Sequence, residues 1–263
     1  MCFRLSRVTK PGIATIFRLQ QAIVLSERSV LTAENVPEKN SVIFVWLNNY
    51  AGVLLKTPTK TLLIDPVDVK AKNYPHVDAV LITHEHYDHL DQRLIAEIQK
   101  TTGCRIIADA TSAKKLKLLI PTEKLVETRA GEQTSIGEVK IKTQKCKHPA
   151  ETPVTFIISS DGGLKIWHTA DSQPYPEMAT IAQKEKIDVV FCTVGIAPGT
   201  SPESGAEIAW LTKPKVAIPY HTNSVDSQKK FAEILKREQP KTSAVIPEVG
   251  KAYQISIGER KHE

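Results

Sequence analysis

The 263-residue chain lacks several features that mark specialised classes of protein. No uninterrupted apolar stretch reaches the length of a membrane span, and no secretory signal is recognisable. The four cysteines lie far apart and form no C-x-x-C pair. With 41% hydrophobic and 24% charged residues, the composition is that of an ordinary globular protein. We therefore expect a soluble, cytoplasmic protein with free thiols and no membrane partner.

Acidic residues are scarce at the start of the chain, where Glu27 is the first. A basic, acid-poor start can be a targeting segment, an added helix, or the result of a start codon assigned too early. The helix alternative depends on apolar residues at near-helical spacing: Ile16, Leu19, Ile23 and Val24. We therefore separate residues 1–40, as an N-terminal extension, from a domain of residues 41–263.

The formal net charge is +6 and the isoelectric point is near 9.0. This charge would favour an anionic partner, such as a phosphorylated metabolite or a nucleic acid. The alternative is a solvated basic surface, because lysine is scattered through the chain.

Beyond residue 40, short apolar runs alternate with amphipathic stretches. The apolar runs predict strands at 41–47, 52–56, 61–65, 79–83, 105–108, 139–143, 154–159, 164–168, 188–193 and 215–219, with two more near Ala244 and Tyr253. The amphipathic stretches predict helices at 91–100, 111–119, 176–186, 203–211 and 226–237. Strands come first in each half and helices later, which indicates sheets packed face to face with helices outside.

Four potential metal ligands fall within six residues after the apolar run 79–82: His84, His86, Asp88 and His89. Alternate side chains of an extended chain point the same way, so His84 and His86 can converge on one ion. A turn could then bring Asp88 and His89 to a second position. Imidazole and carboxylate are typical ligands of zinc, manganese and iron. The alternative is a polar loop that caps a helix.

Three further candidate ligands lie just past other predicted strands: His148, Asp171 and His221. Ends of buried strands hold side chains rigidly enough for metal binding. With the first cluster they make seven ligands, which is too many for one tetrahedral zinc and suits a pair of ions.

The order H-x-H-x-D-H, then His, Asp and His, resembles the metallo-beta-lactamase superfamily. More narrowly, the chain is similar to small metal-dependent hydrolases related to L-ascorbate-6-phosphate lactonase and to the UPF0173 group. The resemblance covers residues 42 to 257 and includes the segments 62–66, 78–84, 167–172 and 218–221. It implies an α/β fold, a four-layer αββα sandwich with the site at one edge of the inner sheets.

The resemblance also implies roles for individual residues. It assigns one ion to His84, His86 and His148, a second ion to Asp88, His89 and His221, and a bridging position to Asp171. Asp65 would bind no ion itself but would orient one of the ligands that do. The expected cofactors are two divalent ions, zinc in the first place, with manganese or iron as alternatives.

A dinuclear site of this kind predicts a hydrolase in which metal-bound hydroxide attacks a carbonyl or phosphoryl ester of a small substrate, anionic substrates included. Asp88 is the candidate catalytic residue, because it could orient the nucleophile and accept its proton. His168 is a weaker candidate as leaving-group acid, and we expect it to belong to the core or to the layer behind the ligands. The alternatives are a nuclease of the same fold and a di-iron redox enzyme. Redox relatives usually have glutamate at the position of His86 and carry a flavin domain.

The chain departs from the family pattern around the ligands. It has Asn48-Asn49-Tyr50 where relatives carry Gly-His-Ser, and Ala170-Asp171-Ser172 in place of Gly-Asp-Thr. The turn at 194–199 also differs, because it reads Val-Gly-Ile-Ala-Pro-Gly where relatives carry a glycine-rich turn. No ligand is lost, but the surroundings of the metals differ, so the lactonase substrate does not carry over.

Overall fold

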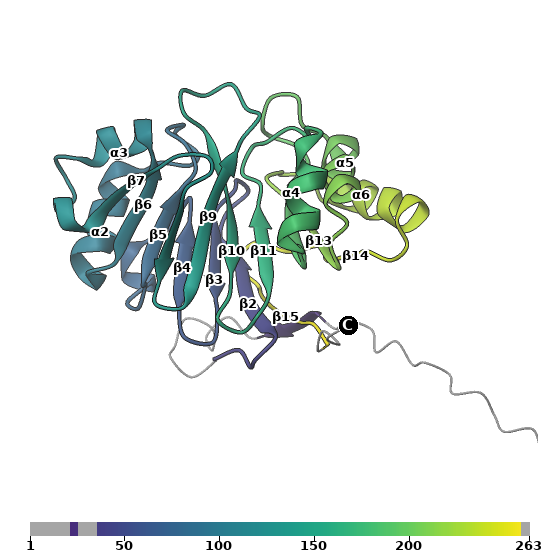
Figure 1. Cartoon of the computed structure of the whole chain (residues 1–263), viewed down its shortest axis with the longest axis horizontal. Coiled ribbons are helices and arrows are strands. Elements are labelled where there is room, and N and C mark those ends of the chain that lie inside the picture. Colours follow the sequence, from purple (N-terminus) through teal and green to yellow (C-terminus); the bar gives the residue numbers. More distant parts are fainter. Residues whose placement is uncertain (1–21, 26–35, 259–263) are drawn as a thin grey trace, which may run out of the picture.

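A computed structural model describes residues 22–25 and 36–258. In this part of the chain the strands form two mixed sheets that face each other, and helices cover both outer faces (Figure 1). This is the four-layer αββα sandwich that the sequence predicted, so the predicted fold class is confirmed.

The first sheet contains eight of the described strands. Their order is β1 (Ala22–Leu25), β15 (Ala252–Ser256), β2 (Ser41–Trp46), β3 (Val53–Lys56), β4 (Thr61–Ile64), β5 (Ala79–Ile82), β6 (Arg105–Asp109) and β7 (Leu125–Thr128). Neighbours from β1 to β4 are antiparallel, and those from β4 to β7 are parallel. The carboxyl ends of β4 and β5 therefore lie side by side.

The second sheet has the same two-part design in seven of the described strands. Their order is β14 (Ser243–Ala244), β13 (Val216–Tyr220), β12 (Val189–Thr193), β11 (Lys165–His168), β10 (Val154–Ser159), β9 (Val139–Lys145) and β8 (Gln133–Ile136). From β14 to β11 the pairs are parallel, and from β11 to β8 they are antiparallel. The carboxyl ends of β11 and β13 thus share one edge.

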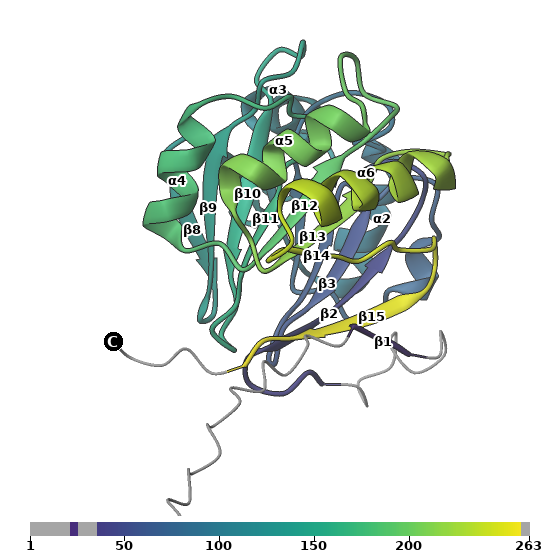
Figure 2. The same cartoon turned by 90° about the vertical axis from the view of Figure 1, so that its right-hand side faces the viewer.

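Helices cover the outer faces in two groups, seen from two sides in Figures 1 and 2. The first sheet is covered by α2 (Gln92–Thr102) and α3 (Ala110–Leu116), and the second by α4 (Glu177–Glu185), α5 (Pro202–Thr212) and α6 (Val225–Glu238). Short 3-10 turns lie at η1 (Ala71–Asn73) and η2 (Thr122–Lys124). The N-cap of α2 is Asp91, because its side chain accepts hydrogen bonds from the backbone N–H groups of Arg93 and Leu94.

Both faces of the central strands are buried, which explains their nearly continuous apolar sequences. In β2, Val42 and Phe44 face the core between the sheets, whereas Ile43 and Val45 pack toward the first helical layer. Across the central core, the rings of Phe44 and Phe191 meet edge to face with centroids 5.3 Å apart. The two sheets are thereby held in fixed positions relative to each other, which fixes the strand ends that carry the site.

The structure adds strands that the sequence pattern did not reveal. β7 and β8 were not predicted, and β1 lies where the helix alternative was considered. Ile23 and Val24 belong to this strand, so the helix alternative is wrong there, whereas Ile16 and Leu19 lie outside the described residues. Because β1 pairs with β15, part of the stretch 1–40 joins the first sheet (Figure 2). The division of the chain into an extension of residues 1–40 and a domain of residues 41–263 stays a prediction.

No helix in the described part of the chain combines the length and the apolar character needed to cross a membrane.

Candidate metal centre

Residues that follow five strands meet at one edge of the sandwich. On the first sheet, Asp65 follows β4 and His84 comes two residues after β5. On the second sheet, His148 follows β9, Asp171 follows β11 and His221 follows β13. β4 and β5 are parallel neighbours, and β9, β11 and β13 run in one direction in the second sheet, so their carboxyl ends lie together and the side chains converge across the gap. Two groups of possible metal ligands form there.

The first group consists of His84, His86 and His148. His84 and the side chain of His148 are fully buried, and His86 is half-buried. Nδ1 of His86 lies 3.2 Å from Nε2 of His84 and 3.2 Å from Nε2 of His148. Three imidazole nitrogens thus face one small space.

The second group consists of Asp88, His89, Asp171 and His221, all buried. Nε2 of His89 and Nε2 of His221 are 3.4 Å apart. Oδ2 of Asp88 lies 3.9 Å from the first of these nitrogens and 3.7 Å from the second. The structure therefore brings together all seven residues that the sequence proposed as ligands, in the two predicted sets.

Asp171 faces both groups. Its Oδ1 lies 3.1 Å from Nε2 of His89 and 3.1 Å from Nε2 of His221. Its Oδ2 lies 3.6 Å from Nε2 of His148 and 3.8 Å from Nε2 of His84. One carboxylate oxygen is thus directed to each group, which is the arrangement that a bridging ligand needs.

The geometry fits a pair of divalent ions. Two nitrogens bound at about 2.0–2.1 Å to a tetrahedral zinc lie about 3.3–3.4 Å apart. Nδ1 of His86 lies 3.2 Å from each of its two neighbours in the first group, and the two ring nitrogens of the second group are 3.4 Å apart. Among the described residues, Oδ1 of buried Asp171 has no hydrogen-bond partner, although two imidazole nitrogens lie 3.1 Å away. A cation would satisfy this oxygen.

Two residues behind the groups hold the histidine rings in place. Oδ2 of Asp65 lies 2.8 Å from Nδ1 of His89, which leaves Nε2 directed at the second group. Asp65 also accepts bonds from the backbone N–H and the hydroxyl of Thr83, at 2.8 and 2.6 Å. The same hydroxyl lies 3.0 Å from Nδ1 of His84. Contacts of this kind fix the ring orientation and tautomer of metal-binding histidines.

The backbone at the site is strained where three strands end. Asp65, Ala170 and His221 have φ angles of 44°, 47° and 56°, in the left-handed region that residues other than glycine seldom adopt. Each residue lies just past β4, β11 or β13 and turns the chain sharply toward the ligand groups. Clustering of such conformations at one edge is typical of functional sites.

Comparisons with known proteins identify the family of the chain. Residues 48–222 match the family model of the beta-lactamase superfamily domain. The chain belongs to the metallo-beta-lactamase superfamily. A UPF0173 metal-dependent hydrolase from Polynucleobacter asymbioticus is 27% identical to it in an alignment 240 positions long that covers 77% of this chain and 83% of the relative. The predicted family is thereby confirmed.

Solved structures support the fold of this superfamily member. A metallo-beta-lactamase fold protein from Bacillus subtilis has a TM-score of 0.67 and 17% identity, over 82% of this chain and all of the other. The diiron beta-hydroxylase CmlA from Streptomyces venezuelae has a TM-score of 0.66 and 16% identity, over 85% of this chain and 55% of its own. At these identities the likeness shows the fold alone.

Burial lowers the pKa values of the histidines in this superfamily member, and neighbouring carboxylates raise them. Burial lowers the pKa of three of them: His84, His148 and His221. Burial acts in the same direction on His89, but the carboxylates of Asp171 and Asp65 raise its pKa well above the usual value. The nearby imidazoles, His89 foremost, outweigh burial and lower the pKa of Asp171. Asp171 is therefore an anion and His84, His148 and His221 are neutral imidazoles, which are the forms that bind metals, whereas His89 would have to release a proton to bind an ion.

His168 belongs to the core, as the sequence indicated. It is fully buried, its Nε2 lies 2.9 Å from the carbonyl oxygen of Ala51, and its Nδ1 accepts a bond from the N–H of Ala170. Its ring packs against Tyr220 with centroids 5.2 Å apart. With both ring nitrogens occupied, His168 is not suited to protonate a leaving group.

Sequence reasoning missed Thr83 and gave no role to Tyr50. Thr83 has no signal of its own, because its role depends on the position of Asp65 across the β4–β5 pair. The ring of Tyr50 lies 6.1 Å from the ring of His221. The signal for Tyr50 was the departure from the family pattern at residues 48–50.

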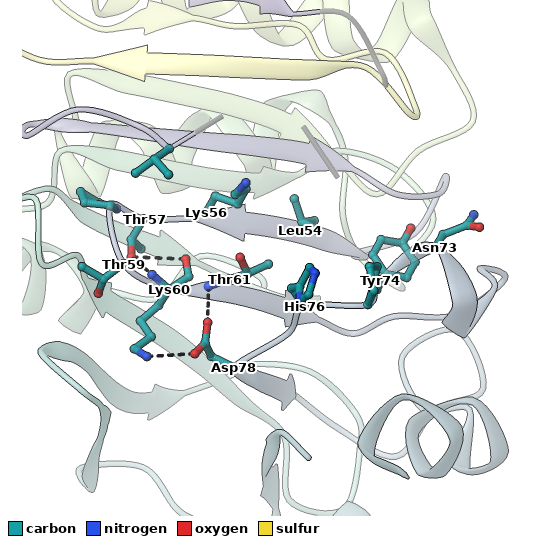
Figure 3. A pocket seen from close by; sticks show the side chains of 13 residues that line it. Leu54, Lys56, Thr57, Thr59, Lys60, Thr61, Asn73, Tyr74, His76 and Asp78 are labelled. Atoms are coloured by element: carbon teal, nitrogen blue, oxygen red, sulfur yellow. Dashed lines mark hydrogen bonds and ion pairs between the residues drawn. The ribbon is translucent and has the colours of Figure 1, made fainter. Parts of the chain in front are cut away.

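A separate cavity of about 210 Å³ lies at the opposite end of the first sheet (Figure 3). It is lined by residues at the end of β3 and the starts of β4 and β5, among them Lys56, Thr61 and His76. Within it, Asp78 accepts bonds from Nζ of Lys60 at 2.9 Å and from the N–H of Thr61 at 2.8 Å. None of these residues contributes to either ligand group, so this cavity is not the candidate metal centre.

We expect Asp65→Asn to weaken metal binding about 10- to 100-fold. Asparagine tolerates the positive φ at this position, but it lacks the negative charge that supports the ring of His89. The measurement is a competition titration with a chromophoric chelator. Asp78→Asn is the matched control, because Asp78 also binds backbone in the first sheet but at its other end. Equal affinity in wild type and Asp65→Asn would contradict the assigned role.

Proposed function

We propose that this metal-dependent hydrolase holds two divalent ions and uses them to hydrolyse a carbonyl or phosphoryl ester bond of a small substrate. His84, His86 and His148 would hold one ion, and Asp88, His89 and His221 the other, with Asp171 shared between them. The observation that carries the proposal is the placement of Asp171, whose two oxygens are directed to different groups.

When bound, the ions supply a nucleophile at neutral pH by lowering the pKa of bound water, and they polarise the bond under attack. The side chains around them perform the remaining tasks. Oδ2 of Asp88 lies 3.7 Å or more from the two imidazole nitrogens of its group, so this carboxylate is the least constrained member. It can accept the proton of the nucleophile and hold it during the reaction. Asp65 and Thr83 keep His89 and His84 in their binding orientations.

One observation weighs against a redox function of the same fold. Redox relatives were expected to place glutamate where this chain has His86, and Nδ1 of His86 lies at the centre of the first group. A set of three imidazoles suits zinc at least as well as iron.

The test starts from purified protein dialysed against chelator and then loaded with zinc, manganese or iron. Metal content is measured by elemental analysis, and activity on lactones, thioesters, sugar phosphates, phosphodiesters and labelled RNA or DNA. We expect about two equivalents of metal and hydrolysis that requires the metal. Protein that retains no metal would contradict the proposal. Cleavage confined to nucleic acid and weakened by salt would instead support the nuclease alternative, and oxygen consumption with visible absorbance would support the redox alternative.

A further inference from the structure

We propose that Tyr50 and Tyr87 form an aromatic clamp beside the second ligand group and select substrates that carry a planar apolar group next to the cleaved bond. The inference rests on the proposed function, because it concerns the substrate of the same site. It narrows that function to esters with an aromatic or similarly flat substituent.

Tyr50 borders the second group, and Tyr87 contacts Tyr50. The ring centroid of Tyr50 lies 6.1 Å from that of His221 and 6.4 Å from that of Tyr87. The two tyrosine rings are nearly perpendicular, at 81°. In the sequence Tyr87 lies between His86, a member of the first ligand group, and Asp88, a member of the second. A substrate that reaches the second group therefore passes next to two aromatic rings.

The loop of Tyr50 is built to hold this residue in place. Oδ1 of Asn48 accepts hydrogen bonds from the backbone N–H groups of Tyr50 and Gly52, at 3.0 and 3.2 Å. Nδ2 of Asn48 donates to the carbonyl oxygen of Val67 at 2.8 Å, and Nε1 of Trp46 donates to that of Tyr50 at 2.7 Å. These bonds fix the backbone from which the ring of Tyr50 projects, and a preorganised loop loses little conformational entropy when a ligand binds.

Tyr87 offers the surface on which a ligand can stack. It is 80% exposed, whereas large aromatic side chains are usually mostly buried. Beside it lies a hollow lined by Tyr87, Leu90, Asp91, Gln92, Arg93 and Leu119. Leu119, 47% exposed, adds an apolar wall. Aromatic rings attract one another at centroid separations of about 4.5–7 Å, in offset or edge-to-face arrangements. A flat group in this hollow would meet those conditions.

The test uses two phosphonates that share one metal-binding head, benzylphosphonate and methylphosphonate, titrated by calorimetry into the zinc-loaded protein. We expect the wild-type protein to bind the benzyl compound about tenfold more tightly. Tyr50→Ala and Tyr87→Ala should each reduce this preference, and the double variant should abolish it. Tyr50→Phe, which retains the ring, should keep it. Trp210→Ala is the control, because Trp210 is an exposed aromatic residue (56%) on α5, outside the site.

The outcomes separate this inference from the function on which it rests. Equal affinity for the two phosphonates in the wild type, or a preference that survives in the double variant, overturns the clamp and leaves the two-metal site intact. Zinc-loaded protein that binds neither phosphonate also overturns it. Protein that holds no zinc overturns the proposed function and the clamp together. Far-ultraviolet circular dichroism of each variant shows that altered binding does not come from unfolding.

Discussion

Asp171→Asn is expected to lower kcat/KM by about 10³-fold or more and to leave the protein with fewer than two equivalents of metal. Asparagine has nearly the same shape as aspartate, so the change isolates charge and ligand number. Asp171 is buried, and four imidazole nitrogens from both groups lie within 3.8 Å of its oxygens.

The chemical reason is that the amide can serve only one group. Its single oxygen can face either His89 and His221 or the first group, and its NH₂ must then face the other. An NH₂ group donates hydrogen bonds and does not bind a cation. The loss of negative charge further weakens both positions, because Asp171 is the carboxylate that the two groups share.

The measurement combines elemental analysis with steady-state kinetics on the best substrate of the metal-loaded enzyme. Asp188→Asn is the matched control, since Asp188 is also a buried aspartate in the second sheet but precedes β12, at the end opposite the site. The Asp188→Asn protein should retain two equivalents of metal and full turnover. An Asp171→Asn variant that does the same would show that Asp171 does not bridge two ions.

The grouping of the candidate ligands could be predicted from the sequence because local spacing and strand ends carry the information. His84 and His86 are two residues apart after a buried strand, so they were expected to converge, and they do so through His86 Nδ1. The more distant ligands were expected because each lies just past an apolar run that reads as a strand. Parallel pairing then brings such ends together without any further signal in the sequence.

Other parts of the structure follow from contacts that no local pattern encodes. β7 and β8 have four residues each, are only partly buried, and include polar residues such as Glu127 and Ser135, so their periodicity is too short to detect. Thr83 acts through Asp65, its neighbour across a strand pair, and through the ring of His84. Tyr50 lies at the site because its ring approaches His221, which follows a strand of the other sheet. Each case requires knowledge of which strands lie next to each other.

His86→Ala is expected to remove one equivalent of metal and to reduce turnover by several orders of magnitude. Nδ1 of His86 lies 3.2 Å from the nitrogens of both other members of the first group, so that group cannot hold an ion well without it. His86 is only half-buried, and the change should therefore alter folding stability little. Elemental analysis, kinetics and thermal unfolding measure the three quantities.

The contrast with Asp171→Asn makes this variant informative. His86 belongs to the first group alone, so the second group should keep its ion, whereas the loss of the shared carboxylate should weaken both positions. His76→Ala, which removes an exposed histidine at the other end of the first sheet, should leave metal content and turnover unchanged. Full hydrolytic activity in His86→Ala would mean that the first group takes no part in the chemistry, because a single remaining ion would then be sufficient for catalysis.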